Sequence, residues 1–296
     1  MMILRDYPRN IPVENIKKVA ALEIRAECFY GAREYKKAEA TFRKILQLAP
    51  EDGRAFFNMA MLHYEHKVQT MTLDDVTRCF YSAYRCGIKD AWEFCIRIQV
   101  HCVQKMVQAG LDIPQIYKEI QTTYESLGEP YEKSKHFTNQ TMRGAAEENK
   151  DKGNEEVAYK LYYASAVYGN DGLAQKELGD YFIQKSEKTD KSKLSMDDFR
   201  YDKDACKAAY WYARADANGV EGADDLCKEI LRSFDNDYLN TELSDAAYLI
   251  SAWCEENTTG IPKDEAVAEY WAFIAEKSRY VSYSDYQKMK EAHGEE

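Results

Sequence analysis

Residues 20–50 read AALEIRAECFYGAREYKKAEATFRKILQLAP, two apolar-periodic segments joined by a short turn. Within each segment apolar residues recur every three or four positions, which is the spacing of one face of an α-helix. The turn runs from Gly31 to Glu34, and Pro50 ends the second segment because proline cannot continue a helix. The stretch predicts two facing helices, with apolar faces made by Leu22, Ala26, Phe29 and Tyr30 and by Tyr35, Ala38, Phe42, Ile45 and Leu46.

The small residues Ala26 and Ala38 are predicted to lie where these two helices cross, because small side chains let helix axes approach. With the order Tyr35, Ala38, Phe42 and the closing proline, the segment resembles the tetratricopeptide repeat, a 34-residue helix pair. It departs from that pattern at Arg33, where the repeat usually has glycine, and at Arg25, where it usually has leucine. A weaker copy follows, with Phe56, Met59, Ala60 and Tyr64 on its first helix, a turn from His66 to Thr72 and an end near Gly87. Further helices are expected over 91–108 and 114–127.

A second spacing recurs later in the chain, where a polar residue is followed four residues on by alanine and seven residues on by tryptophan or leucine. Seven residues make two helical turns, so these positions share one face. The stretches that show it are Asp204–Ala208–Trp211, Asp264–Ala268–Trp271 and Asn154–Ala158–Leu161. Together with the loop 260–264, they resemble Sel1-like repeats, relatives of the tetratricopeptide unit.

Three residues in this second half have expected local roles. Asn154 is expected to cap a helix by accepting backbone N–H bonds, and Gly219 to follow a helix C-terminus. Gly179 is expected to let a neighbouring helix backbone approach closely. The polar stretch from Ser186 to Arg200 is interpreted as an insertion between repeats, either a mobile loop or a short added helix.

These patterns divide the chain into tetratricopeptide-like repeats over 14–127, a divergent connecting helix over 128–153 and Sel1-like repeats over 154–293. The fold class they imply is all-α, a right-handed α-α superhelix, or solenoid, of antiparallel helix pairs. No strand pattern is evident, and the 14 glycines and 6 prolines fall between the periodic segments.

Composition limits the partners and the location. The 296 residues are 45% hydrophobic with a formal net charge of −11, which favours a globular fold and disfavours nucleic acid and anionic membranes as partners. No run reaches the roughly 18 apolar residues that a transmembrane helix needs. The N-terminus lacks the apolar segment of a signal peptide, so a cytoplasmic protein is expected.

The eight cysteines are all expected inside helices, as reduced, packed thiols. The region from His63 to Cys102 raises the alternative of a metal site, since it holds His63, His66, Cys79, Cys86, Cys95, His101 and Cys102. Cys79 and Cys86, seven residues apart on one helix, would lie about 10 Å apart. Thiolates on one zinc ion must lie within about 4 Å of each other, so no metal and no other cofactor are expected.

Catalytic motifs are missing from the sequence. His63 and His66 are three residues apart and do not form the HExxH metalloprotease arrangement, and no phosphate-binding loop, dinucleotide fingerprint or nucleophile elbow occurs. We therefore expect no enzyme. An enzymatic or metal-binding protein with a site around His63 to Cys102 remains the alternative, and a structural subunit that self-associates through its tyrosines and tryptophans is a third possibility.

The resemblance to tetratricopeptide arrays implies a groove lined by the first helix of each pair. The residues expected there are Glu23, Glu27 and Tyr30 in the first copy and Phe57, Asn58, Met61 and Tyr64 in the second. Members of the family that grip a terminal carboxylate use Lys, Asn and Arg, and here only Asn58 matches. The two glutamates would repel an anion. The sequence thus predicts a non-catalytic interaction scaffold that binds a neutral or basic apolar protein segment.

Overall fold

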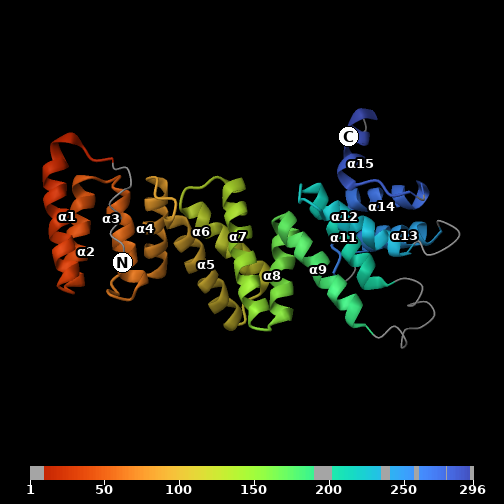
Figure 1. Ribbon diagram of the computed structural model, residues 1–296, viewed down its shortest axis with the longest axis horizontal. Coiled ribbons are helices and arrows are strands. Elements are labelled where there is room, and N and C mark those ends of the chain that lie inside the picture. The colour runs from red at the N-terminus through yellow and green to blue at the C-terminus, as the bar shows by residue number, and fades with distance from the viewer. Residues whose placement is uncertain (1–9, 190–201, 235–240, 257–259, 278, 294–296) are drawn as a thin grey trace. The chain divides into compact units, whose positions relative to one another are not determined.

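The computed structural model describes residues 10–189, 202–234, 241–256, 260–277 and 279–293, and within these ranges every regular element is a helix (Figure 1). The prediction of an all-α chain is confirmed. The elements are η1 (Val13–Asn15), α1 (Ile16–Gly31), α2 (Tyr35–Leu48), α3 (Gly53–Tyr64), α4 (Leu73–Arg85), α5 (Ala91–Gln108), α6 (Ile113–Ser126), α7 (Tyr131–Asp151), α8 (Glu155–Tyr168), α9 (Gly172–Lys188), α11 (Lys203–Ala217), α12 (Ala223–Phe234), α13 (Thr241–Glu256), α14 (Glu265–Lys277) and α15 (Tyr283–His293).

The helices fall into two compact units, which are described separately. Unit 1 comprises Met1–Asp112 and Lys118–Gly144, and unit 2 comprises Ile113–Tyr117 and Ala145–Glu296. In both, helices that follow one another in sequence pack together as antiparallel pairs. Within the stretch 128–153, which was expected to be a connecting helix, residues 131–151 form α7.

In unit 1, α1 packs on α2 and α3 packs on α4, while α2 contacts α3 and α4 contacts α5. Ala26 on α1 and Ala38 on α2 are both fully buried, which is consistent with their predicted place between the two helices. Phe42 and Ile45 of α2 belong to the same core, and the other apolar residues of the predicted faces lie against it, partly buried. The helices predicted over 91–108 and 114–127 are α5 and α6, the second shifted by one residue.

Capping side chains fix where the helices of unit 1 begin. Asp52 accepts backbone N–H bonds from Arg54 and Ala55, at 3.1 and 3.4 Å, and starts α3. Thr72 and Asp75 form a reciprocal capping box at the start of α4. The long turn predicted from His66 to Thr72 lies between these two helices.

In unit 2, α9 packs against α11, α11 against α12, and α13 against α14. Trp211 and Trp271, which complete the shared seven-residue spacing, are both fully buried. The indole N–H of Trp211 donates to the backbone oxygen of Gly260 at 2.9 Å. The spacing seen in the sequence therefore marks core positions on α11 and α14.

Several local expectations in unit 2 need correction. Asn154 precedes α8, but its side chain makes no capping hydrogen bond. The start of α11 is capped by Asp202, which accepts the backbone N–H of Asp204. Gly179 does face a neighbour, but the close atoms belong to the ring of Tyr212 and not to a helix backbone.

The remaining local expectations have mixed outcomes. Gly219 follows the end of α11 in the left-handed conformation, with φ of 74°, as expected. Cys86 lies one residue beyond the last residue of α4, so it is not inside a helix. Of the predicted insertion, residues 186–188 end α9 and residues 190–200 lie outside the described part of the chain. None of the described helices is long and apolar enough to cross a membrane.

Candidate functional site

The predicted groove residues lie on α1 and α3, in unit 1. On α1, Glu23 is partly buried and forms an ion pair with Arg54 of α3, with its Oε1 3.2 Å from the arginine Nη2. Tyr30 stands edge-on to Tyr35, with ring centroids 5.3 Å apart. Partial burial and the nearby Glu65 carboxylate raise the pKa of the Tyr30 hydroxyl. Glu23 is thus held by α3, and Tyr30 packs against the first residue of α2.

Two of the predicted residues on α3 have little surface left for a partner. Phe57 is 5% exposed because its ring packs edge-on against Phe80 of α4 and Phe94 of α5, at centroid distances of 5.5 and 5.6 Å. Asn58 is 3% exposed, and its Oδ1 has no hydrogen-bond partner among the described residues. Met61 and Tyr64 are half-buried against the same core.

The structure adds one residue that the sequence reading missed. Ile24 of α1 is 65% exposed and lies one turn before Glu27, on the face of α1 turned away from Ala26. A signal was present, since Ile24 falls outside the apolar periodicity of Leu22, Ala26 and Phe29. Ile16, one residue after η1, is also exposed. We call Ile16, Glu23, Ile24 and Glu27 the α1 surface.

The region from His63 to Cys102 separates into two groups. Cys79 and Cys95 are buried, and burial raises the pKa of their thiols to about 11 and about 12. The histidines His63, His66 and His101 instead line one cavity. Among the residues that the structure describes, no group of three or more His, Cys, Asp or Glu side chains could hold a metal ion.

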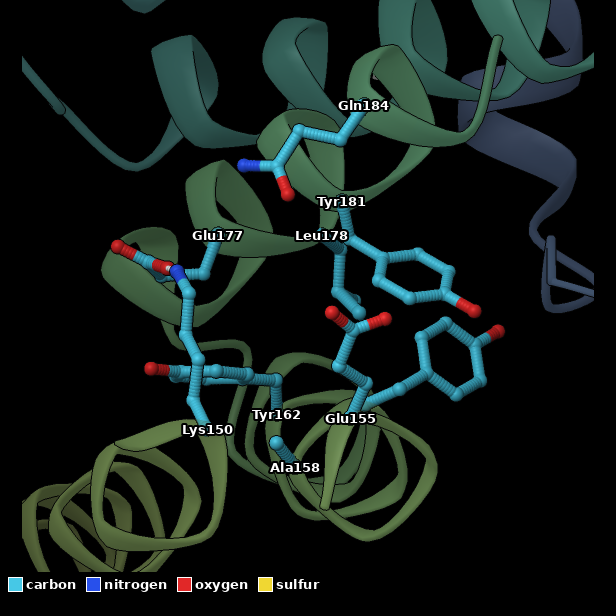
Figure 2. A pocket seen from close by; sticks show the side chains of 9 residues that line it. Lys150, Glu155, Ala158, Tyr162, Glu177, Leu178, Tyr181 and Gln184 are labelled. Carbon is cyan, nitrogen blue, oxygen red and sulfur yellow. Dashed lines mark hydrogen bonds and ion pairs between the residues drawn. The ribbon is translucent and has the colours of Figure 1, made fainter. Parts of the chain in front are cut away.

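Unit 2 has a small hollow between α7, α8 and α9, shown in Figure 2. Lys150 and Glu177 face each other on one side of it, 3.0 Å apart, and Glu155 and Tyr181 lie on the other. Its volume is about 40 Å³. Pockets that hold small molecules measure roughly 300–1,000 Å³, so this hollow is too small for such a ligand.

The fold and these surfaces define an all-helical protein of consecutively packed helix pairs. Comparison with known proteins adds no family to this class. No protein-family model matches the chain, and no curated protein sequence matches it either.

Proposed function

We propose that this protein is a non-catalytic scaffold that binds a neutral or basic apolar segment of a partner protein through the α1 surface. The observation that carries the proposal is the exposure of Ile24 beside Glu27 on a helix whose opposite face is packed in the core. Burying an exposed isoleucine stabilises a complex by about 1.5–3 kcal/mol. A neighbouring carboxylate favours lysine or arginine over glutamate in the partner.

The helix pairs are also proposed to form a superhelix. Antiparallel pairs packed in sequence order, together with the tetratricopeptide-like and Sel1-like spacings, support a right-handed superhelix of such repeats. Repeats of this kind present one helix of each pair to a partner, which is where α1 and α3 would lie. We propose that this scaffold works in the cytoplasm.

Calorimetric titration with three apolar peptides of equal length tests this proposal, where the peptides differ only in carrying lysines, glutamines or glutamates. We expect the lysine peptide to bind most tightly and the glutamate peptide least. Ile24→Ser should weaken the binding of the lysine peptide about tenfold, which corresponds to ~1.4 kcal/mol of binding free energy. Glu27→Gln should reduce the preference for lysine over glutamine.

The matched control is Tyr248→Ser in α13, because Tyr248 is 71% exposed and lies in unit 2. This variant should bind all three peptides as the parent protein does. Equal affinity for the lysine and glutamate peptides, or equal losses in Ile24→Ser and Tyr248→Ser, would remove the α1 surface as the binding site.

A further inference from the structure

A lysine side chain lies between two aromatic rings in unit 2. Lys207 belongs to α11, and the helices α9 and α13, which both contact α11, each supply one of the rings. Its Nζ atom lies 5.5 Å from the ring centroid of Phe182 in α9 and 5.9 Å from that of Trp253 in α13. Phe182 is buried, whereas Lys207 and Trp253 are half-buried. The amine is thus held at the edge of the core, beside an indole that is still partly exposed.

The stem of Lys207 packs against the loop before α14. A Cβ atom on Gly260 would lie 3.6 Å from Cδ of Lys207 and 2.8 Å from the ring of Phe182. The backbone oxygen of Gly260 accepts the indole N–H of Trp211, which lies one turn after Lys207 on α11. The end of the side chain remains in contact with solvent, because the fully buried nitrogen and oxygen atoms without a partner belong to other residues. Lys207 therefore has a packed stem and an accessible amine.

No carboxylate is paired with this amine in the part of the chain that the structure describes. Asp204 of α11 acts on Lys207 through its charge, but its Oδ1 lies 3.2 Å from Nζ of Lys185 in α9. Lys185 and Lys203 are close enough to repel the Lys207 ammonium. From α8, the hydroxyl of Tyr159 reaches the same loop, 3.5 Å from where a Cβ of residue 260 would lie. The amine is thus surrounded by two aromatic rings and two further lysines, and the one nearby carboxylate is shared.

These surroundings disfavour the ammonium form. Burial lowers the pKa of Lys207 below the ordinary lysine value of 10.5, and the charges of Lys185 and Lys203 act in the same direction. Asp204 and the two rings act in the opposite direction, but centroids 5.5 and 5.9 Å away lie near the limit of about 6 Å for a cation–π contact. A lysine amine is activated as a nucleophile when it is desolvated or lies next to another cation. Lys207 meets both conditions.

We propose that Lys207 is a covalent binding site for small aldehydes with an aromatic body, which form an imine with its amine and lay their ring against the exposed part of Trp253. The amine nitrogen attacks the carbonyl carbon, a C=N bond replaces the C=O bond, and the oxygen leaves as water with both amine protons. This step needs no oxidant or reductant, and hydrolysis reverses it. The site does not depend on the α1 surface, because it lies in unit 2 and takes a different class of ligand.

Reductive trapping on the full chain tests the proposal. The protein is treated with benzaldehyde and sodium cyanoborohydride, which reduces the imine to a stable secondary amine, and the modified lysines are identified by peptide mass mapping. Lys160, an exposed lysine of α8, is the internal reference. At about pH 8, where an ordinary lysine is almost entirely protonated, Lys207 should be modified at least about threefold faster than Lys160.

A second aldehyde tests the role of the aromatic ring. Propanal forms the same kind of imine but has no ring to lay against Trp253. The ratio of modification at Lys207 to that at Lys160 should therefore be lower with propanal than with benzaldehyde. Trp253→Leu should lower the benzaldehyde ratio to the propanal value. A benzaldehyde ratio at or below one, or equal ratios for the two aldehydes in the parent protein, would overturn the proposal.

A variant at an exposed position tests the activation of the amine. Lys185→Gln removes a neighbouring positive charge and leaves Asp204 without its paired lysine, so Lys207 should be modified about threefold more slowly at the same pH. The matched control is Lys152→Gln, since Lys152 is also exposed and pairs with Glu148. This control should keep the parent rate at Lys207. If Lys185→Gln reacted at Lys207 as fast as the parent protein, the activation on which the proposal rests would be contradicted, whether or not Trp253→Leu folds.

Discussion

At the residue scale, Arg33 has a backbone conformation that favours glycine. Tetratricopeptide repeats usually have glycine at this position, and Arg33 adopts the left-handed conformation, with φ of 60°, that glycine adopts most easily. The backbone N–H of Arg33 donates to Tyr30 and that of Glu34 to Phe29, which closes the C-terminus of α1. The local backbone therefore fits a glycine even though the sequence has arginine.

Replacing Arg33 with glycine is expected to raise the free energy of unfolding by up to about 1 kcal/mol. The left-handed conformation destabilises an ordinary residue by about 1–2 kcal/mol. Glycine also increases the conformational entropy of the unfolded chain, and this offsets about 0.5–1 kcal/mol of the gain. Urea denaturation measures the difference. The control, Lys44→Gly at an exposed position inside α2, should lower the free energy of unfolding by about 1 kcal/mol.

At the element scale, one helix in each unit begins with the same pair of residues, an aspartate followed by a glycine. Asp52 and Gly53 begin α3, and Asp171 and Gly172 begin α9, each aspartate accepting a backbone N–H bond from the residue two positions on. Both glycines lie against the turn that follows a later helix, where Cys86 and Val220 approach so closely that a Cβ atom would not fit. This shared feature could not be predicted from the sequence, because a close approach between the start of one helix and the turn after another leaves no periodic signal.

The helices also show which features of the fold could be predicted from the sequence. The bounds of α5 follow from periodicity and from the glycines that flank it, since both signals are local. The burial of Phe57 could not be predicted, because it depends on Phe94, which the following helix pair supplies. Helical spacing shows that a face is apolar, but it does not show which neighbour covers that face. The cavity that His63 lines was missed for the same reason, since its walls come from three separate helices, α3, α4 and α5.

The packing of α9 on α11 gives a prediction at this scale. A Cβ atom on Gly179 would lie 2.5 Å from the Tyr212 ring, which is 3% exposed and held by a 2.6 Å hydrogen bond from its hydroxyl to Asp180. Overpacking destabilises by about 1–3 kcal/mol, whereas alanine in place of glycine stabilises a helix by about 1 kcal/mol. Gly179→Ala should therefore lower the free energy of unfolding, by up to about 2 kcal/mol.

Gly31→Ala is the matched control for Gly179→Ala. Gly31 ends α1, has no positive φ and would place its Cβ more than 4 Å from any neighbouring heavy atom. This variant should keep the stability of the parent protein or exceed it by up to about 1 kcal/mol in the same urea denaturation. Equal stability of the two alanine variants would show that the Tyr212 ring moves aside without loss.

At the scale of the whole molecule, buried thiols occur in both units. Burial raises the pKa of Cys79 to about 11 and that of Cys95 to about 12 in unit 1. In unit 2 it raises the pKa values of Cys206, Cys227 and Cys254 to about 12. The fold therefore favours the protonated thiol at five positions, because each of these pKa values lies above the ordinary thiol pKa of 9.0 that applies in the unfolded chain.

Alkaline conditions should therefore destabilise the protein. Between pH 9 and the raised pKa values, the unfolded chain loses thiol protons that the folded chain keeps. Because the unfolded state then binds fewer protons, the free energy of unfolding falls as pH rises, by at most about 1.4 kcal/mol per thiol and pH unit. Below pH 9 both states are protonated at these thiols, and this contribution to stability is fully present. Urea denaturation at a series of pH values from neutral to about pH 10.5 measures the slope.

Cys95→Ala identifies the thiols as the cause. Cys95 is fully buried, and its Sγ donates to the Thr77 backbone oxygen, at 3.7 Å, so the variant loses stability at every pH. Its slope above pH 9 should nevertheless be shallower than that of the parent protein, because one titrating thiol is gone. Cys28→Ala, at an exposed position of α1, should keep the parent slope. If Cys95→Ala and the parent lost stability equally steeply, the alkaline sensitivity would have to come from other groups, such as the buried tyrosines Tyr124 and Tyr210, whose pKa values burial also raises.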